Sequence, residues 1–322
     1  MTAAPSERVF EVGDFHRGER LDRFLQAMVP KMSRSSVQLA LSEGRVVLAS
    51  GTEAKASRRL VLGERVTLFG RSATGELPAP PPVLARGEGW VVVNKPAGMR
   101  TTPTSRDPGR DVYSLTGLSP AHRLDRFTSG ALLLTDDPDA ARYFEPAFRE
   151  GRVAKEYAAI LQGRPDQPSW TCSDPIGPEQ GSRVQSKVTW CATGTAGAQD
   201  AETHFAVAAT IERTDGDWTL VRAAPRTGRR HQVRVHAAAS GHPLVGELLH
   251  AGDERDFVRF QLGQAVELPA GIEPGRHLLH ARSLAFTAPT GEGVVVVAPW
   301  PADYPEALTA GWDSLDPEPA QG

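Results

Sequence analysis

A single carboxylate inside a cluster of cations is the feature of this 322-residue sequence that most suggests chemistry. In "AHRLDRFTSG", Asp125 lies between Arg123 and Arg126, and the apolar run "ALLLTDD" follows directly. An acid beside cations stays ionised even in a closed pocket, because the opposite charges lower its pKa. The pattern therefore predicts a carboxylate that works in its charged form, next to a buried strand.

A second basic segment could supply the partner of that carboxylate. Residues 225–247, "PRTGRRHQVRVHAAASGHPLVGE", concentrate basic side chains in one turn and helix: Arg226, Arg229, Arg230 and Arg234. Arg230 and Arg234 are four residues apart, so we expect them to share one helix face. An exposed basic face is the simplest interpretation of such a run. Arg234, however, lies between two valines, and a buried arginine needs an acid or phosphate partner, for which Asp125 is the natural candidate.

Motifs for other kinds of chemistry are missing from the sequence. We find no Gly-x-Gly-x-x-Gly after a strand, no phosphate-binding loop of the Walker type and no Gly-x-Ser-x-Gly elbow. The histidines at positions 231, 236, 242 and 250 fit no zinc spacing, and the two cysteines form no Cys-x-x-Cys pair. We therefore predict no metal site and interpret these histidines as hydrogen-bonded structural groups.

The hydrophobic pattern predicts the elements that must position these residues. "WVVVNKPAG" and "GALLLTDD" alternate only weakly, which is typical of strands buried on both faces. A helix is predicted after Asp136 or Asp137, with Pro138 in its first turn. Further strands are predicted in "KEYAAIL", "ETHFAVAATIE", "DWTLVRAAP" and "GVVVVAP". Many strands with few helices predict an α+β fold with a large mixed or antiparallel sheet.

A stretch rich in proline and glycine divides the chain. Residues 73–89 are predicted as a linker, residues 90–310 as the large unit and residues 311–322 as a frayed tail. In residues 14–72 a helix is predicted with Leu21, Phe24, Leu25 and Met28 on one face, and a second helix begins near Ser33. Short strands are predicted in "RVVLA", "RRLVL" and "RVTLF".

The composition restricts the setting of the protein. Its formal net charge is −3, so the chain is not basic overall, although basic residues can still cluster locally. The first residues show no apolar run behind a basic flank, and the longest apolar runs are too short to cross a bilayer. Two cysteines make no disulfide framework. We expect a cytoplasmic protein with no membrane partner.

"HRLDRFTSG" and "TGRRHQVRVH" together resemble the RluA-type pseudouridine synthases, a family that isomerises uridines in ribosomal and transfer RNA. "VVVNKPAGM" resembles the family's first motif, "GRVAKEYAAIL" its Lys-x-Tyr strand, and "LLHARSLAFTAPTGE" its C-terminal pattern. The resemblance covers most of the large unit. The sequence departs from the pattern where the family usually has Asp and then Tyr-Gly, because this chain has Glu247 and His250–Ala251.

The small unit resembles the S-four RNA-binding domain, which commonly precedes this catalytic domain. Two short helices, with Arg34 at the start of the second, and then a small hairpin sheet carry the resemblance over residues 14–70. Together the two resemblances imply an α+β synthase domain with a large mixed or antiparallel sheet, preceded by a small α/β RNA-binding domain. Arg34 is expected among the RNA contacts of the small domain.

The resemblance also implies roles for individual residues. Asp125 matches the catalytic aspartate, Tyr157 the active-site tyrosine, Arg234 the basic residue that pairs with the aspartate, and Arg123 the arginine that helps to open the RNA. Tyr157 would stack on a uracil that has been flipped out of the RNA. The remaining residues expected to bind RNA are Arg229, Arg230 and His231.

The reaction breaks an N-glycosidic bond, turns the uracil and rejoins it through carbon, so it requires no metal, redox step or nucleotide cofactor. We expect a monomer that acts on ribosomal large-subunit RNA, with transfer RNA as the other possibility. Two alternatives remain: an RNA-binding protein on an inactive synthase scaffold, and a hydrolase that releases free uracil through Asp125. The modified uridines, and whether Asp125 attacks the sugar or the base, are left open by the sequence.

Overall fold

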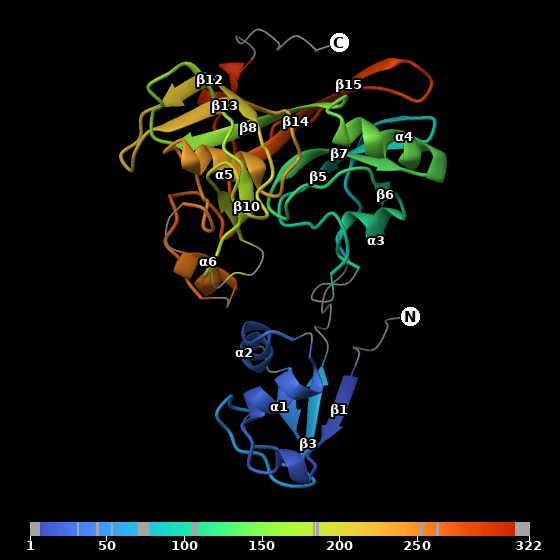
Figure 1. The fold of residues 1–322 in the computed structure, drawn as a ribbon, viewed down its shortest axis with the longest axis vertical. Helices are drawn as coiled ribbons and strands as arrows, with labels where there is room; N and C mark the ends of the chain where they lie inside the picture. Colours follow the sequence, from blue (N-terminus) through green and yellow to red (C-terminus); the bar gives the residue numbers. More distant parts are fainter. Residues whose placement is uncertain are drawn as a thin grey trace. The chain divides into compact units, whose positions relative to one another are not determined.

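The computed structural model describes residues 7–30, 32–42, 45–52, 54–69, 77–104, 109–182, 184, 187–251, 254–261 and 264–312. The chain divides into two compact units, the first formed mainly by residues up to Leu77 and the second beginning at Pro78. In Figure 1 the first unit is blue, and the second runs from green through yellow to red.

The first unit is a three-stranded antiparallel sheet packed with two helices. Its elements are β1 (Glu7–Glu11), a 3-10 turn (Asp14–His16), α1 (Leu21–Met28), α2 (Arg34–Ser42), β2 (Val46–Leu48) and β3 (Arg65–Phe69), and the strand order is β1-β3-β2. On the predicted apolar face of α1, Leu21, Phe24 and Leu25 are fully buried in this core and Met28 is partly buried. The hydroxyl of Ser33 accepts a hydrogen bond from the Ser36 N–H at 3.2 Å, as expected at the start of α2.

Two predictions for this unit are wrong. The segment "RRLVL" forms no strand and makes only an isolated bridge between Arg59 and Arg20. The unit also begins before residue 14, because β1 pairs with β3 from Glu7 onward. Leu60 exchanges backbone hydrogen bonds with Gly18 and Glu19, which belong to no strand, so a short apolar run is not extended into a ladder here.

The second unit is built on a mixed ten-stranded sheet, which confirms the predicted α+β class. The strand order is β4-β5-β7-β14-β8-β13-β12-β9, with β15 paired to β14 and β6 paired to β7. Every pair in it is antiparallel except β7 with β14. The strands are β4 (Val83–Gly87), β5 (Trp90–Lys95), β6 (Ser119–Pro120), β7 (Ser129–Thr135), β8 (Ala154–Gln162), β9 (Ser169–Cys172), β12 (Thr203–Ile211), β13 (Trp218–Pro225), β14 (Leu279–Thr287) and β15 (Gly293–Val297).

The second unit also contains five helices in the described ranges. They are α3 (Val112–Thr116), α4 (Pro138–Arg149), α5 (Gln232–Ala239), α6 (Glu254–Gln261) and α7 (Glu306–Thr309), and a separate hairpin consists of β10 (Ile176–Pro178) and β11 (Val188–Trp190). Of these helices, α4, α5 and α7 contact strands of the sheet. Asp137 caps α4 by accepting hydrogen bonds from the N–H groups of Asp139 and Ala140. Figure 1 shows α3 and α4 beside the β5–β7 part of the sheet and α5 beside the β8–β13 part.

Tyr157 on β8 shows that two separate segments lie on the same face of the sheet. Its side chain packs against the core cluster that contains Leu124 of the Asp125 loop, and also against the cluster that contains Val233 of α5. Neighbouring side chains of a strand point to opposite faces, so one side chain cannot contact both faces. The Asp125 loop and α5 therefore approach each other across Tyr157.

Two glycines allow the close contacts that this arrangement needs. A Cβ on Gly130, whose φ is +110°, would lie 2.2 Å from the carbonyl oxygen of Ala281 where β7 meets β14. A Cβ on Gly246, with φ +80°, would lie 2.0 Å from the carbonyl oxygen of Arg276. Only glycine fits such positions, because any side chain would clash with the backbone and strain the conformation.

The predicted boundaries of the large unit also need correction. Residues 83–87 of the expected linker form β4, which pairs with β5 at the edge of the sheet. The expected tail begins too early, since Trp312 is buried among the residues that pack around α7. In both places the prolines and glycines of the sequence predicted an irregular segment. Pairing with β5 and packing around α7 hold these segments in place instead.

Candidate active site

The loop that carries Asp125 is fixed by hydrogen bonds to its backbone. Thr101 exchanges two hydrogen bonds with the backbone of Leu124, at 2.9 and 3.2 Å. Lys95, which is fully buried, donates from Nζ to the carbonyl oxygens of Arg126, Met99 and Pro96 at 3.2, 2.8 and 3.0 Å. The loop thus enters β7 with a fixed backbone, while the side chain of Asp125 keeps 28 % of its surface exposed.

Arg234 on α5 reaches Asp125, as its apolar neighbours suggested. Its Nη1 donates to Oδ2 of Asp125 at 2.9 Å. The same guanidinium donates from Nε and Nη2 to the two carboxylate oxygens of Glu247, at 2.7 and 2.8 Å. The Arg234 side chain is 7 % exposed and that of Glu247 is fully buried. Glu247 therefore fixes the orientation of the arginine that contacts Asp125.

The charge of Asp125 is strongly favoured in this site. Burial alone would raise the pKa of its carboxyl group, but His231, Arg234 and His277 hold it well below its ordinary value. Burial likewise lowers the pKa of His231 to about 4, so this histidine is neutral at pH 7. Arg234 is then the permanent cation of the group, and Asp125 is an ionised, partly exposed carboxylate.

Two histidines complete the surroundings of the carboxylate. His231 Nε2 lies 3.8 Å from Oδ1 of Asp125, and His231 Nδ1 shares a hydrogen bond with Nε2 of His250 at 3.0 Å. His231 precedes α5 with φ +54°, and no other non-glycine residue in the described ranges has a positive φ. The turn before it is held by Gln232, whose Oε1 accepts hydrogen bonds from the Arg229 N–H and the Thr227 hydroxyl.

Tyr157 provides the apolar wall of the site. It is half-buried on β8, in register with Ala223 of β13 and Ala281 of β14. Burial, together with the negative charge of Asp125, raises the pKa of its phenol, so the ring keeps its proton at neutral pH. The arrangement offers a flat aromatic surface near an ionised carboxylate.

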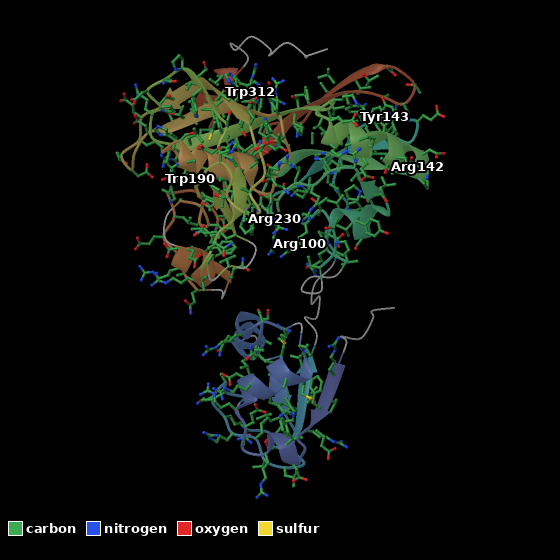
Figure 2. All side chains as sticks on the ribbon, viewed as in Figure 1. Arg100, Arg142, Tyr143, Trp190, Arg230 and Trp312 are labelled. Atoms are coloured by element: carbon green, nitrogen blue, oxygen red, sulfur yellow. The ribbon has the colours of Figure 1, made fainter. Side chains whose placement is uncertain are left out.

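The arginines predicted to bind RNA differ in how far they are exposed. Arg123 and Arg230 are exposed, whereas Arg229 donates from Nε to the carbonyl oxygen of Asp200 at 2.8 Å. The expected helix face shared by Arg230 and Arg234 is wrong, because α5 begins at Gln232 and Arg230 lies in the turn before it. Figure 2 labels Arg230 below α5 in that view. Arg34 is exposed at the start of α2, in the first unit.

The remaining predicted histidines make structural hydrogen bonds. His236 contacts the Thr203 hydroxyl at 2.9 Å and the Asp174 carbonyl oxygen at 3.0 Å, and His242 contacts the Gln162 carbonyl oxygen at 3.1 Å. Across the described ranges, no cluster of three or more histidine, cysteine or acidic side chains is arranged to hold a metal ion.

Sequence reasoning missed three groups of this site. Glu247 was recognised only as a departure from a motif, His250 was interpreted as a structural histidine as well as a departure, and His277 was not considered at all. His277 is buried, and its Nε2 shares a hydrogen bond with the Thr128 hydroxyl at 3.0 Å, three residues after Asp125. The acid at position 247 could have been assigned as a partner of Arg234 from its place close behind the basic helix.

Comparison with known proteins agrees with the fold. The family model described as RNA pseudouridylate synthase matches residues 89–239. An uncharacterized RNA pseudouridine synthase of Mycobacterium bovis is 31% identical over 326 residues, covering 94% of this chain and 97% of its own length. The ribosomal large subunit pseudouridine synthase C of Vibrio cholerae is 29% identical over 314 residues, covering 91% and 93%.

Solved structures show the same relation. The human RNA pseudouridylate synthase domain containing 1 protein superposes with a TM-score of 0.56 at 27% identity, covering 74% of this chain and 91% of that one. The fold and these relatives thus define an RNA-modifying isomerase. The chain belongs to the RluA-type RNA pseudouridine synthases, enzymes that convert uridine to pseudouridine in RNA. No helix in the described part of the chain is long and apolar enough to span a membrane.

Proposed function

We propose that Asp125 is the catalytic carboxylate of this synthase and that it acts in its ionised form on a uridine flipped out of the RNA. The observation that carries the proposal is the hydrogen bond of 2.9 Å from the buried Arg234 to Asp125, whose side chain keeps 28 % of its surface exposed. Arg234 donates one hydrogen bond to the partly exposed Asp125 and two to the buried Glu247. This arrangement keeps Asp125 charged and fixes its orientation.

Tyr157 and Arg123 are proposed to handle the flipped nucleotide. The ring of Tyr157 offers a stacking surface for uracil beside Asp125, and stacking on aromatic side chains is how flipped bases are commonly held. Arg123 is exposed two residues before Asp125, so its side chain is accessible to an RNA backbone or to the gap left by the base. The exposed Arg230 and the partly buried Arg229 and His231 would contact the RNA around this point.

The proposed substrate is ribosomal large-subunit RNA. Support comes from the relatives in Vibrio cholerae and Salmonella typhimurium, which are both named ribosomal large subunit pseudouridine synthase C and match over more than nine-tenths of this chain. The first unit is proposed to bind the same RNA as an S-four-like domain. Its two helices and small sheet, and the exposed position of Arg34 at the start of α2, support that assignment.

The test of the catalytic assignment is Asp125→Asn, assayed on a large-subunit RNA transcript. Asparagine keeps the shape but cannot carry the charge, so pseudouridine formation should stop while the thermal unfolding profile stays cooperative. A folded variant that still forms pseudouridine at the normal rate refutes the assignment.

The nature of the product and of the RNA are tested separately. Release of free uracil by the wild-type protein would favour an N-glycosidic hydrolase over an isomerase. Mapping pseudouridine in RNA from a deletion strain and its parent identifies the RNA and the position. Sites lost only from transfer RNA would overturn the ribosomal assignment and leave the catalytic one intact.

A further inference from the structure

The two oxygens of the Asp125 carboxylate face different partners. Oδ2 accepts the hydrogen bond from Arg234, whereas Oδ1 faces His231 Nε2 at 3.8 Å. That distance is too long for a hydrogen bond but short enough for a small movement to make one. Among the described residues, none donates a hydrogen bond to Oδ1, so this is the oxygen left for the substrate and for His231.

His231 is held in a conformation that costs free energy. A non-glycine residue in the left-handed region is strained, and such strain persists only where its surroundings enforce it. Here the Gln232 side chain bonds the turn before it, and the histidine ring is tied to His250. In this conformation His231 precedes α5, and its Nε2 lies 3.8 Å from Oδ1 of Asp125.

One short turn organises both sides of the carboxylate. Glu247 accepts hydrogen bonds from the backbone N–H groups of Leu249 and His250, at 2.8 and 3.2 Å, while it binds the guanidinium that reaches Oδ2. The His250 side chain, three residues on, contacts the ring that faces Oδ1. Residues 247–250 therefore orient Arg234 through an acid and His231 through an imidazole.

We propose that His250 is a positioning residue of the reaction: it fixes His231 in the tautomer that carries its proton on Nε2, aimed at Oδ1 of Asp125. A carboxylate attracts an N–H and repels a nitrogen lone pair, so Nε2 of His231 carries the proton. Its Nδ1 is then an acceptor, and the 3.0 Å contact requires His250 Nε2 to be the donor. The pair orients the reactive oxygen of Asp125, and this role rests on the catalytic role proposed for that residue.

The direct test is the tautomeric state of the two histidines in the intact protein. Nitrogen-15 NMR of histidine-labelled wild-type protein at pH 7 distinguishes an N–H at Nδ1 from one at Nε2, and the variants His231→Asn and His250→Gln assign the signals. The expected result is a proton on Nε2 in both rings. A proton on Nδ1 of His231 overturns the proposal whatever the activity of Asp125.

The kinetic test uses single-turnover reactions on a large-subunit RNA transcript, with enzyme in excess. His250→Ala should slow the chemical step by about tenfold, the scale of a slightly misplaced reacting group, with RNA affinity unchanged. His250→Gln retains an N–H donor at similar reach and should recover most of that rate. His242→Ala, which alters a histidine that contacts only the Gln162 carbonyl oxygen among the contacts described, serves as the matched control.

The outcomes separate this inference from the proposed function. If Asp125→Asn is inactive while His250→Ala reacts at the wild-type rate, the inference alone fails. If the folded His250→Gln is as slow as His250→Ala, donation by residue 250 is refuted. If His250→Ala does not fold, the tautomer in the wild-type protein decides the question.

Discussion

Arg234→Ala should be the most damaging single substitution in the site, for stability as well as for activity. The change removes a cation that is 7 % exposed and donates three hydrogen bonds, at 2.7, 2.8 and 2.9 Å. It leaves the fully buried Glu247 without its charge partner and Asp125 without its hydrogen bond. Breaking a buried ion pair in this way typically costs about 3–5 kcal/mol of unfolding free energy.

The loss should depend on pH with a definite sign. In the wild-type protein the pKa of Glu247 lies well below its ordinary value, because Arg234 outweighs the effect of burial. Its ion pair therefore contributes stability above the unfolded pKa, and this contribution is lost as the pH falls through the folded pKa. In Arg234→Ala, burial without a partner raises the pKa instead, so the folded variant takes up a proton. The deficit should be largest at neutral pH and should shrink as the pH falls below about 5.

The assay combines urea unfolding between pH 4 and 8 with single-turnover rates over the same range. A raised pKa of Asp125 should move the acidic limb of the rate profile to higher pH. Arg234→Lys keeps the charge but loses the planar fork, so both effects should be intermediate. Two controls also remove an arginine: Arg230→Ala in the turn before α5 and Arg142→Ala on the surface of α4, both labelled in Figure 2.

Two results would refute this reasoning. A stability loss within about 0.5 kcal/mol, the range of ordinary surface substitutions, would mean that the ion pair is not buried in solution. An equal loss of the chemical rate in Arg230→Ala, measured with enzyme in excess, would replace the specific pair with a diffuse basic surface. Arg230→Ala is expected to weaken RNA binding and to leave the chemical rate unchanged.

Three further outcomes are expected. Burial lowers the pKa of His231 to about 4 and that of His250 to about 3, so the unfolded state binds more protons than the folded state below pH 6.5. As the pH falls from 6.5 to 4, the unfolding free energy should therefore decrease by up to about 1.4 kcal/mol per pH unit for each ring. Urea titrations of His250→Gln, which lacks one of the two rings, should show a shallower decrease. Glu247→Gln places an amide N–H against a guanidinium and should cost about 1–3 kcal/mol of unfolding free energy, a prediction that a neutral effect in denaturant melts would contradict. Arg34→Ala should weaken RNA binding and reduce the slope of log affinity against log salt by about one, with Arg142→Ala as the control. An unchanged slope would mean that Arg34 contacts no RNA phosphate.

The sequence by itself determined the elements whose own side chains favour them, such as the buried strands and the starts of two helices. The apolar runs of β5 and β7 are buried on both faces, as weak alternation predicted. Ser33 and Asp137 begin their helices because a short polar side chain accepts hydrogen bonds from the free N–H groups of the first turn. The contact between Arg234 and Asp125 was also predictable, since an arginine among valines requires an acid.

Tertiary structure alone decided what depends on distant segments. The strand β4 lies in a stretch rich in proline, and it forms because β5 offers a partner for its backbone. The parallel contact of β7 with β14 joins segments about 150 residues apart, and no local pattern specifies which strands meet. No local pattern specifies the left-handed backbone of His231 either. The ring of His250 and the turn before α5 hold His231 in that conformation. Glu247 looked like a departure from a motif until the fold placed its carboxylate against Arg234, because a side chain's partner is set by packing and not by its position in the chain.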